Sequence, residues 1–240
     1  MQYLVLLYGE ESLSPQPGTP EWDADMEGYM AFGELADKAI VTGDALWDNS
    51  RVRTVRHDGG KVRVTNGPFA ETTEGLGGYY VLDAPSLDDA IELVRHIPAV
   101  TYGGGEIRPM VQHFDASDGR PEAPAGTARW IATIQGPETD ADQPGSAGWD
   151  AGMAAHGAFV EGAGDAVYGG GAVHPASTAT TVRVRDGELL VTDGPYAETM
   201  EMVGGYYLIA GTPEAAAEVA GSIPVNEGGR VELREIMELG

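Results

Sequence analysis

The strongest constraint on this chain is an internal repeat. The stretch NGPFAETTEGLGGYY at 66–80 returns as DGPYAETMEMVGGYY at 193–207, with ten of fifteen positions identical and an offset of 127 residues. The offset also relates 22–24 to 149–151, and it has fallen to 126 where Arg108 recurs as Arg234. Each copy is far longer than a solenoid unit of about 20 to 50 residues. The sequence therefore predicts two copies of one small domain.

The predicted domain boundaries follow from the composition between the copies. Residues 114–127, FDASDGRPEAPAGT, are rich in Pro, Gly and charge and lack apolar periodicity, which is typical of a linker. Repeat one is then 1–113 and repeat two is 128–240, each long enough to bury its own core. An unstructured linker of this length spans about 20 Å, which allows the two repeats to pack face to face.

Charge and composition exclude several classes of function. Against 14 basic residues the chain has 38 acidic ones, and its formal charge of −24 disfavours nucleic acid and anionic bilayers as partners. No apolar run approaches the roughly 20 residues of a membrane helix, and the N-terminus lacks the features of a signal peptide. We expect a cytoplasmic protein. Because cysteine is absent, disulfides, thiolate catalysis and cysteine-ligated metal centres are excluded.

The local patterns predict the same order of elements in both repeats. In repeat one these are a strand at 2–8, a helix that begins after Thr19-Pro20 and runs towards Ile40 with Gly43 as a stop, a β-hairpin at 51–57 and 61–65, a strand at 78–82, a helix after Ser86, and a strand at 106–111. The glycine pairs at 77–78 and 204–205 indicate a β-bulge or a close backbone approach.

This order is typical of a ferredoxin-like α+β sandwich with a β-hairpin insertion. Its helices cover one face of a mainly antiparallel sheet and leave the other face bare. A duplicated chain can pack its two bare faces together, as other chains do when they dimerise. We therefore predict two ferredoxin-like repeats packed sheet to sheet as an intramolecular pseudo-dimer, a dimeric α/β barrel.

Three features resemble the DGPF-motif proteins of the YCII-related family. They are Asp193-Gly194-Pro195-Tyr196-Ala197-Glu198, the later Gly204-Gly205-Tyr206-Tyr207, and a closing Glu-x-Arg, and the resemblance covers both repeats. It implies a dimeric α/β-barrel fold with a pocket between helix and sheet. It also implies an enzymatic role without a defined substrate, and a gene neighbourhood with extracytoplasmic-function sigma factors.

Two departures from the family pattern bear on chemistry. Asn66 stands where the motif has Asp, so only Asp193 keeps this carboxylate as a candidate ligand-binding group. The His and Asp pairing proposed as catalytic in the shorter YCII branch is not matched, since the counterpart of His156 is Tyr29. His156 stays a candidate acid or base whose pKa can be tuned into the useful range, with packing or solvent contact as the alternative.

Within the motif, the Gly-Pro pairs are explained as turn devices. Glu71 and Glu198 are the candidate catalytic residues, because a carboxylate on a rigid turn beside an aromatic can have its pKa raised and can act as acid or base. The alternative is that they accept backbone N–H groups of the turn. Tyr79 and Tyr206 each point to the opposite face from the next tyrosine, where a phenol can line a pocket or fill the core.

The remaining candidates are cationic. Arg108 and Arg234 each follow a Glu by two residues, and a guanidinium there can hold a ligand carboxylate bidentately or form an ion pair with Glu106 or Glu232. The two hairpins are also rich in arginine, which indicates either a solvated strand face or attraction of an anion. The five histidines show no metal-binding spacing, so neither a metal nor a cofactor is predicted.

Two functions are consistent with these patterns. The first is a small-molecule-binding protein, which would be an enzyme if a motif glutamate moves a proton on a small anionic substrate. The alternative is a non-catalytic regulatory or ligand-binding module with a protein partner in sigma-factor signalling, as the family resemblance implies. The sequence does not decide whether the protein is an enzyme, because fold analogy alone does not assign chemistry.

Overall fold

The computed structural model describes residues 1–58, 61–68, 74–119, 122–137, 144–196, 201–226 and 228–238, apart from the side chain of Glu201. The chain divides into two compact units, and each unit is assembled from three separate segments. Unit 1 comprises Met1–Leu46, Thr72–Met110 and Ser177–Glu198. Unit 2 comprises Trp47–Glu71, Val111–Ala176 and Thr199–Gly240. Neither unit is therefore a continuous stretch of sequence.

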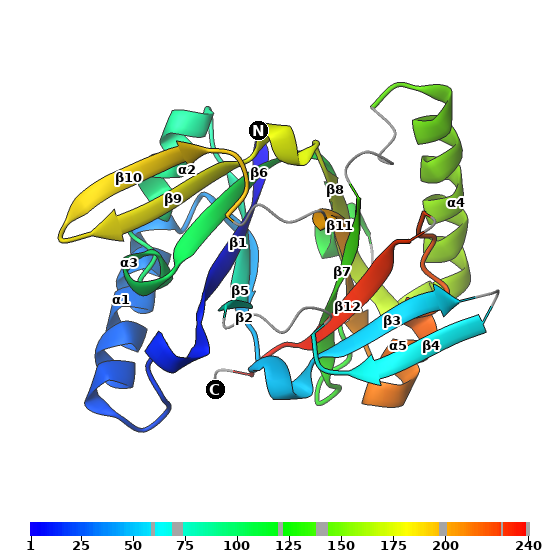
Figure 1. The fold of residues 1–240 in the computed structure, drawn as a ribbon, viewed down its shortest axis with the longest axis horizontal. Helices are drawn as coiled ribbons and strands as arrows, with labels where there is room; N and C mark the ends of the chain where they lie inside the picture. The colour runs from blue at the N-terminus through cyan, green and yellow to red at the C-terminus, as the bar shows by residue number, and fades with distance from the viewer. Residues whose placement is uncertain are drawn as a thin grey trace. The chain divides into compact units, whose positions relative to one another are not determined.

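Unit 1 is an antiparallel sheet with helices from repeat one (Figure 1). Its elements are β1 (Gln2–Glu10), α1 (Pro20–Ala36), β2 (Ile40–Ala45), β5 (Glu74–Asp83), α2 (Leu87–Val94), α3 (Ala99–Tyr102), β6 (Gly104–Phe114, of which the last four residues belong to unit 2), β9 (Thr180–Arg185) and β10 (Glu188–Asp193). The strand order is β2-β5-β1-β6-β9-β10.

Unit 2 repeats this plan. Its elements are β3 (Arg53–Asp58), β4 (Lys61–Asn66), β7 (Arg129–Pro137), α4 (Ala147–Ala163), β8 (Val167–Val173), β11 (Glu201–Ala210), α5 (Pro213–Ala220) and β12 (Arg230–Glu235). The strand order is β8-β11-β7-β12-β3-β4. Short 3₁₀ turns occur at Glu11–Leu13, Asn49–Arg51, Ala116–Asp118, Gly164–Ala166 and Ala176–Thr178.

The two β-hairpins are exchanged between the repeats. Hairpin β3–β4 comes from repeat one but pairs through β3 with β12 of repeat two, where Val55 lies opposite Val231. Hairpin β9–β10 comes from repeat two but pairs through β9 with β6 of repeat one, where Val182 lies opposite Gly105. In Figure 1 the cyan hairpin lies beside the red strand β12, and the yellow hairpin lies beside the green strand β6. Each unit thus has the core of one repeat and the hairpin of the other.

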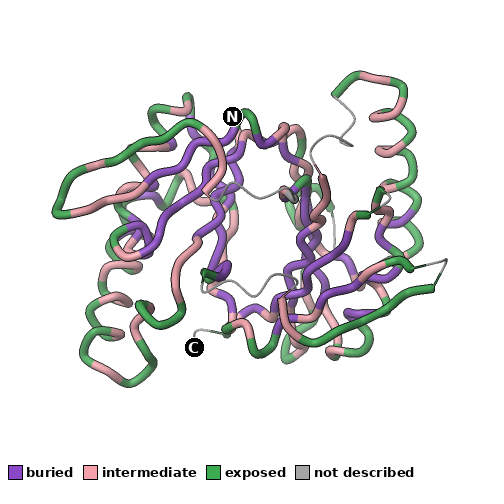
Figure 2. Tube along the Cα trace, in the orientation of Figure 1, coloured by how far each residue is buried: buried purple, intermediate pink, exposed green. Residues whose placement is uncertain are grey.

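Each exchanged hairpin contributes to the core that it joins. Val182 is fully buried among Val5, Val94 and Ile107 of unit 1. Its counterpart Val55 is buried in the core of unit 2. Burial of one such side chain stabilises a fold by about 1.5 to 3 kcal/mol. The inner strands of both hairpins are therefore integral to the cores, whereas every residue of the outer strand β4 is exposed (Figure 2).

The first helix and the strand after it correct the sequence prediction. Thr19 caps α1 as expected, since its hydroxyl oxygen accepts the N–H of Trp22 at 3.2 Å. The helix ends at Ala36 rather than near Gly43, and residues 40–45 form β2. Gly43 is required there because a Cβ at this position would collide with the ring of Tyr80. With β2 included, repeat one has the order β-α-β, hairpin, β-α-β, and the predicted ferredoxin-like α+β class is confirmed.

The predicted irregularities at the paired glycines are also confirmed. The register of β5 on β1 shifts at Gly77, and the register of β11 on β7 shifts at Gly204. Among the described residues, no helix combines the length and the apolar character that crossing a membrane requires.

Candidate functional site

A buried ion pair on β6 is the foundation of the candidate site in unit 1. Ile107 points into the helix-covered core, so Glu106 and Arg108 point to the opposite face of the sheet. Both side chains are buried, and Arg108 Nη1 lies 3.1 Å from Glu106 Oε1. The structure thus shows the ion pair that the sequence left as one alternative for Arg108. Loss of either partner would leave a buried charge, which is costly.

The DGPY motif of the exchanged hairpin binds to this ion pair. Gly194 has φ of +104°, and its carbonyl oxygen accepts the hydroxyl of Thr181 at 2.9 Å, so the predicted turn is formed. The turn directs the backbone N–H of Tyr196 to Glu106 Oε2 at 2.9 Å. Because the acceptor is charged, this bond is stronger than a neutral one. The motif of repeat two is therefore held on a strand of repeat one.

Aromatic and cationic side chains surround this contact. The ring of Tyr196 stacks on Tyr8 with centroids 5.2 Å apart, and its hydroxyl donates to Glu74 Oε1 at 2.8 Å. Burial and the hydrogen bond to Glu74 raise the pKa of Tyr196, so the phenol stays protonated near neutral pH. The guanidinium of Arg183 lies 4.4 Å from the centre of the Tyr196 ring and donates to the Tyr196 carbonyl oxygen at 3.2 Å.

Gly104 makes room for this arrangement. A Cβ at Gly104 would lie 2.7 Å from Cε2 of Tyr196 and 3.1 Å from Cγ of Arg183. These distances are shorter than normal contacts, so a larger residue would displace the Tyr196 ring. Arg183, Tyr196 and Tyr8 are each only half-buried, which leaves part of the cluster accessible.

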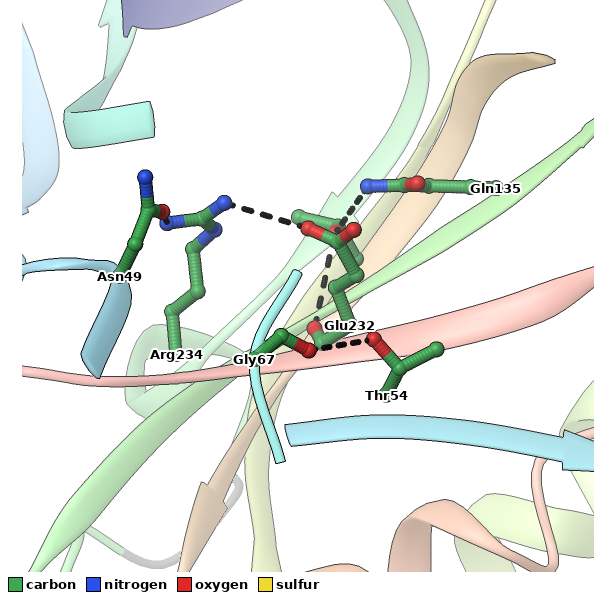
Figure 3. A network of polar contacts seen from close by, with 7 residues as sticks. Asn49, Thr54, Gly67, Gln135, Glu232 and Arg234 are labelled. Atoms are coloured by element: carbon green, nitrogen blue, oxygen red, sulfur yellow. Dashed lines mark hydrogen bonds and ion pairs between the residues drawn. The ribbon is translucent and has the colours of Figure 1, made fainter. Parts of the chain in front are cut away.

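The corresponding cluster in unit 2 has different chemistry (Figure 3). Glu232 and Arg234 form the equivalent buried ion pair at 3.2 Å, but Arg234 Nη1 also donates to Asn49 Oδ1 at 2.9 Å. Gln135 stands at the position of Tyr8, and its amide donates to the hydroxyl of Thr133 at 3.3 Å. The turn itself is kept, since the hydroxyl of Thr54 donates to the carbonyl oxygen of Gly67 at 2.9 Å.

Comparison with known proteins identifies the repeated unit. The family model described as the YCII-related domain matches twice, at residues 1–113 and 128–240. The chain belongs to the YCII-related family. It is also 33% identical over 114 residues to an uncharacterised protein of Rhizobium meliloti (strain 1021), an alignment that covers 46% of this chain and 92% of the relative. The two family matches confirm the tandem duplication.

In each pair of adjacent tyrosines of this YCII-related chain, 79–80 and 206–207, the two side chains point to opposite faces of the strand, as predicted. Tyr79 is fully buried, and its hydroxyl donates to Asp44 Oδ2 at 2.8 Å. Tyr206 is also buried, but its hydroxyl lies 3.0 Å from Nδ1 of His113. The other ring nitrogen of His113 lies 3.0 Å from Asp115 Oδ2. Burial strongly raises the pKa of Tyr206 and keeps its phenol protonated.

Sequence reasoning missed the chain of contacts from Tyr206 through His113 to Asp115. His113 lies at the end of β6 and Asp115 caps the 3₁₀ turn that follows it, so the short His-x-Asp spacing was an available signal. Burial favours the neutral acid at Asp115, but hydrogen bonds from Ser117 and His113 outweigh it and lower the pKa of Asp115. This pair differs from the His and Asp pairing of the shorter YCII branch that the sequence analysis considered, which concerned other positions.

His156 lies apart from the buried ion pair of its unit. It is on α4, and its Nδ1 lies 2.9 Å from the hydroxyl of Tyr207, which belongs to the helix-covered core. Arg234 points to the opposite face of the sheet, since its neighbour Leu233 lies in that core. Burial lowers the pKa of His156, which favours the neutral imidazole. The structure therefore does not bring His156 and Arg234 together.

The other sequence candidates divide into described and undescribed residues. Asp193 is exposed at the end of β10, where it pairs with Thr180 of β9. Glu71 and Glu198 lie outside the described residues, so their predicted acid or base role stays a prediction. Within the part of the chain that the structure describes, no group of three or more acidic or histidine side chains is arranged to hold a metal ion.

Proposed function

We propose that the protein binds a small organic anion at the cluster of Arg183, Tyr196 and Tyr8 in unit 1. The observation that carries this proposal is the hydrogen bond from the Tyr196 amide to Glu106. It fixes a half-buried guanidinium and two phenol rings beside a buried ion pair, in a chain whose net charge is −24. A cation retained at such a place in an acidic protein favours a role in binding an anion.

Each residue of the cluster has a distinct task in this proposal. Glu106 and Arg108 form the rigid base, because each compensates the charge of the other. Arg183 offers the fork of N–H donors that matches a carboxylate. Tyr8 and Tyr196 pack against the apolar part of the ligand. Glu198 follows Tyr196 by two residues in the motif, and we propose it as the acid or base if the bound molecule is also a substrate.

Other expectations from the sequence analysis stay predictions alongside this proposal. The packing of the repeats as an intramolecular dimeric α/β barrel, the cytoplasmic location and the acid or base role of Glu71 stay predictions. So does the alternative of a non-catalytic module linked to extracytoplasmic-function sigma factors. A Glu198→Gln variant separates enzyme from binder once a ligand is found, because it would abolish turnover of a substrate but leave a purely bound ligand unchanged.

The test is a binding screen with matched variants. A panel of small carboxylates at constant ionic strength would be measured by thermal shift and then by isothermal titration calorimetry. We expect Arg183→Gln to weaken the best carboxylate by at least about tenfold, since it removes charge-assisted hydrogen bonds. Arg56→Gln changes the equivalent residue of the other hairpin and serves as the control. Equal losses in both variants, or binding that neither affects, would reject the assignment to unit 1.

A further inference from the structure

The outer strand of each hairpin lies at an edge of its sheet. Within the described part of the chain, β4 pairs only with β3, and β10 pairs only with β9. Each of these strands is six residues long, and all of its residues are exposed except Leu189 of β10. An edge strand presents backbone N–H and C=O groups that can pair with a strand of another chain. The two edges are therefore candidate interaction surfaces.

Both edges carry exposed apolar side chains on the helix-covered side of their sheets. In β4 these are Val62 and Val64, which are 50% and 43% exposed, and Val64 lies opposite Val55 of the unit 2 core. In β10 the side chain is Val191, which is 46% exposed and lies opposite Val182 of the unit 1 core. Apolar side chains left exposed along an edge strand are typical of a surface that another strand covers.

The charges of the two edges are opposite in sign. Strand β4 contains Lys61 and Arg63 and no acidic residue, whereas β10 contains Glu188 and Asp193 and no basic one. Arg63 lies 3.9 Å from Asp58 of β3, but both side chains are exposed, so this ion pair is weak and leaves the charge open to solvent. Pairing of β4 with β4, or of β10 with β10, would oppose like charges. Only pairing of β4 with β10 brings opposite charges together.

The side chains of the two edges also match face by face. Successive residues of a strand point to opposite sides, so the valines of β4 and the pair Leu189 and Val191 of β10 all lie on the helix-covered sides of their sheets. When β4 and β10 pair with these sides together, their apolar side chains meet. Lys61 and Arg63 then share the other side with Glu188, within reach of long side chains on neighbouring strands. One arrangement thus satisfies both the apolar and the charged side chains.

We propose that β4 of one copy of this chain pairs with β10 of a second copy. The pairing uses a different edge of each copy and is therefore heterologous, so a further copy can add to the edge that stays free. Two six-residue edges bury less surface than the roughly 1,200 Å² of the smallest stable complexes, so the association is weak and depends on protein concentration. This inference uses other residues than the organic-anion site and does not depend on that proposal.

The test measures the average mass of the full-length protein by sedimentation velocity over a range of concentrations at constant ionic strength. The average mass of the wild type should rise with concentration. The β4 variant, Lys61→Glu with Arg63→Glu, makes both edges acidic and should weaken association by at least about tenfold. The β10 variant, Glu188→Lys with Thr192→Lys, makes both edges basic and should weaken it similarly, although it lowers the net negative charge of the protein.

An equimolar mixture of the two variants gives the sharpest result. The acidic β4 of one variant then meets the basic β10 of the other, and the two unchanged edges stay complementary. The mixture should therefore associate as the wild type does, although neither variant associates alone. Loss of folding could not be rescued in this way. All four substituted side chains are exposed, so both variants are expected to fold, and circular dichroism checks this.

A matched control separates the edges from a general effect of charge. Lys38→Glu with Arg95→Glu makes the same change in net charge as the β4 variant but lies outside both hairpins, so it should associate like the wild type. A wild type that stays monomeric at every concentration, a mixture that does not associate, or an equal loss in this control overturns the proposal. Loss of association in only one of the two edge variants would indicate pairing of like edges and would overturn it as well.

Discussion

Units 1 and 2 have the same strands in the same order but differ at the residues that surround their buried ion pairs. Gly104 in unit 1 admits the ring of Tyr196, whereas Arg230 occupies the equivalent position in unit 2. Tyr8 is replaced by Gln135. Hydrophobic positions such as Val55 and Val182 are kept because both cores need them. The difference teaches that duplication preserved the scaffold while the two polar faces diverged.

The hairpins are also held differently. In unit 1, Arg185 donates to the carbonyl oxygens of Val100, Thr101 and Gly103 at 2.8, 3.0 and 2.6 Å. These carbonyl groups lie at the C-terminal end of α3, where no further helical turn supplies N–H donors to them. The counterpart of Arg185 in the other hairpin is Asp58. It lies 3.9 Å from Arg63, and both side chains are exposed, so this ion pair contributes little.

The largest expected effect comes from placing the residue of unit 2 into unit 1. In Gly104→Arg the new side chain collides with Tyr196 and disrupts its hydrogen bond to Glu106. We expect the free energy of unfolding to fall by about 2 to 4 kcal/mol, measured by urea denaturation. Gly204→Arg is the control, because a Cβ at Gly204 meets nothing within 4 Å. An equal loss of stability in the two variants would show that Gly104 is not specifically needed to make room for the ring of Tyr196.

A smaller effect is expected from releasing the hairpin of unit 1. Arg185→Gln removes charge-assisted hydrogen bonds to three carbonyl oxygens, so we expect a loss of about 1 to 3 kcal/mol in the free energy of unfolding. The matched variant Asp58→Asn should change stability by no more than about 0.5 kcal/mol. Hydrogen exchange of the β9 amides should accelerate only in Arg185→Gln. Similar exchange in both variants would contradict the asymmetry between the hairpins.

The sequence predicted the scaffold of each unit better than its assembly. Thr19-Pro20 and the glycine pairs marked a helix start and two bulges because these signals are local. Strand β2 was missed, since IVTGDA has weak alternation and Gly43 was interpreted as a helix stop. The exchange of hairpins was also missed, because the alternation around Val55 and Val182 fits an edge strand of either sheet equally well.

The same distinction applies to the candidate site. The spacing in Glu106-x-Arg108 offered an ion pair as one of two alternatives beside ligand binding, and the structure shows the ion pair, since both residues share one face of a strand. The contact between Tyr196 and Glu106 joins residues 90 positions apart and depends on which sheet the hairpin joins. Its necessary partner Gly104 has no side chain and therefore gives no signal before the neighbouring ring is known. Local chemistry was predictable, and contacts that depend on the exchange were not.

The smallest expected effect concerns helices α1 and α4, where Tyr29 in one corresponds to His156 in the other. Burial lowers the pKa of His156 in the folded protein, whereas the unfolded chain has a pKa of about 6.5. As pH falls below about 6.5 the unfolded chain gains a proton that the folded protein does not, so stability decreases with acidification. His156→Gln should flatten the dependence of the free energy of unfolding on pH between about 5 and 7. The other histidines are unchanged in this variant, so an unaltered slope would assign the pH dependence to them and remove this difference between the units.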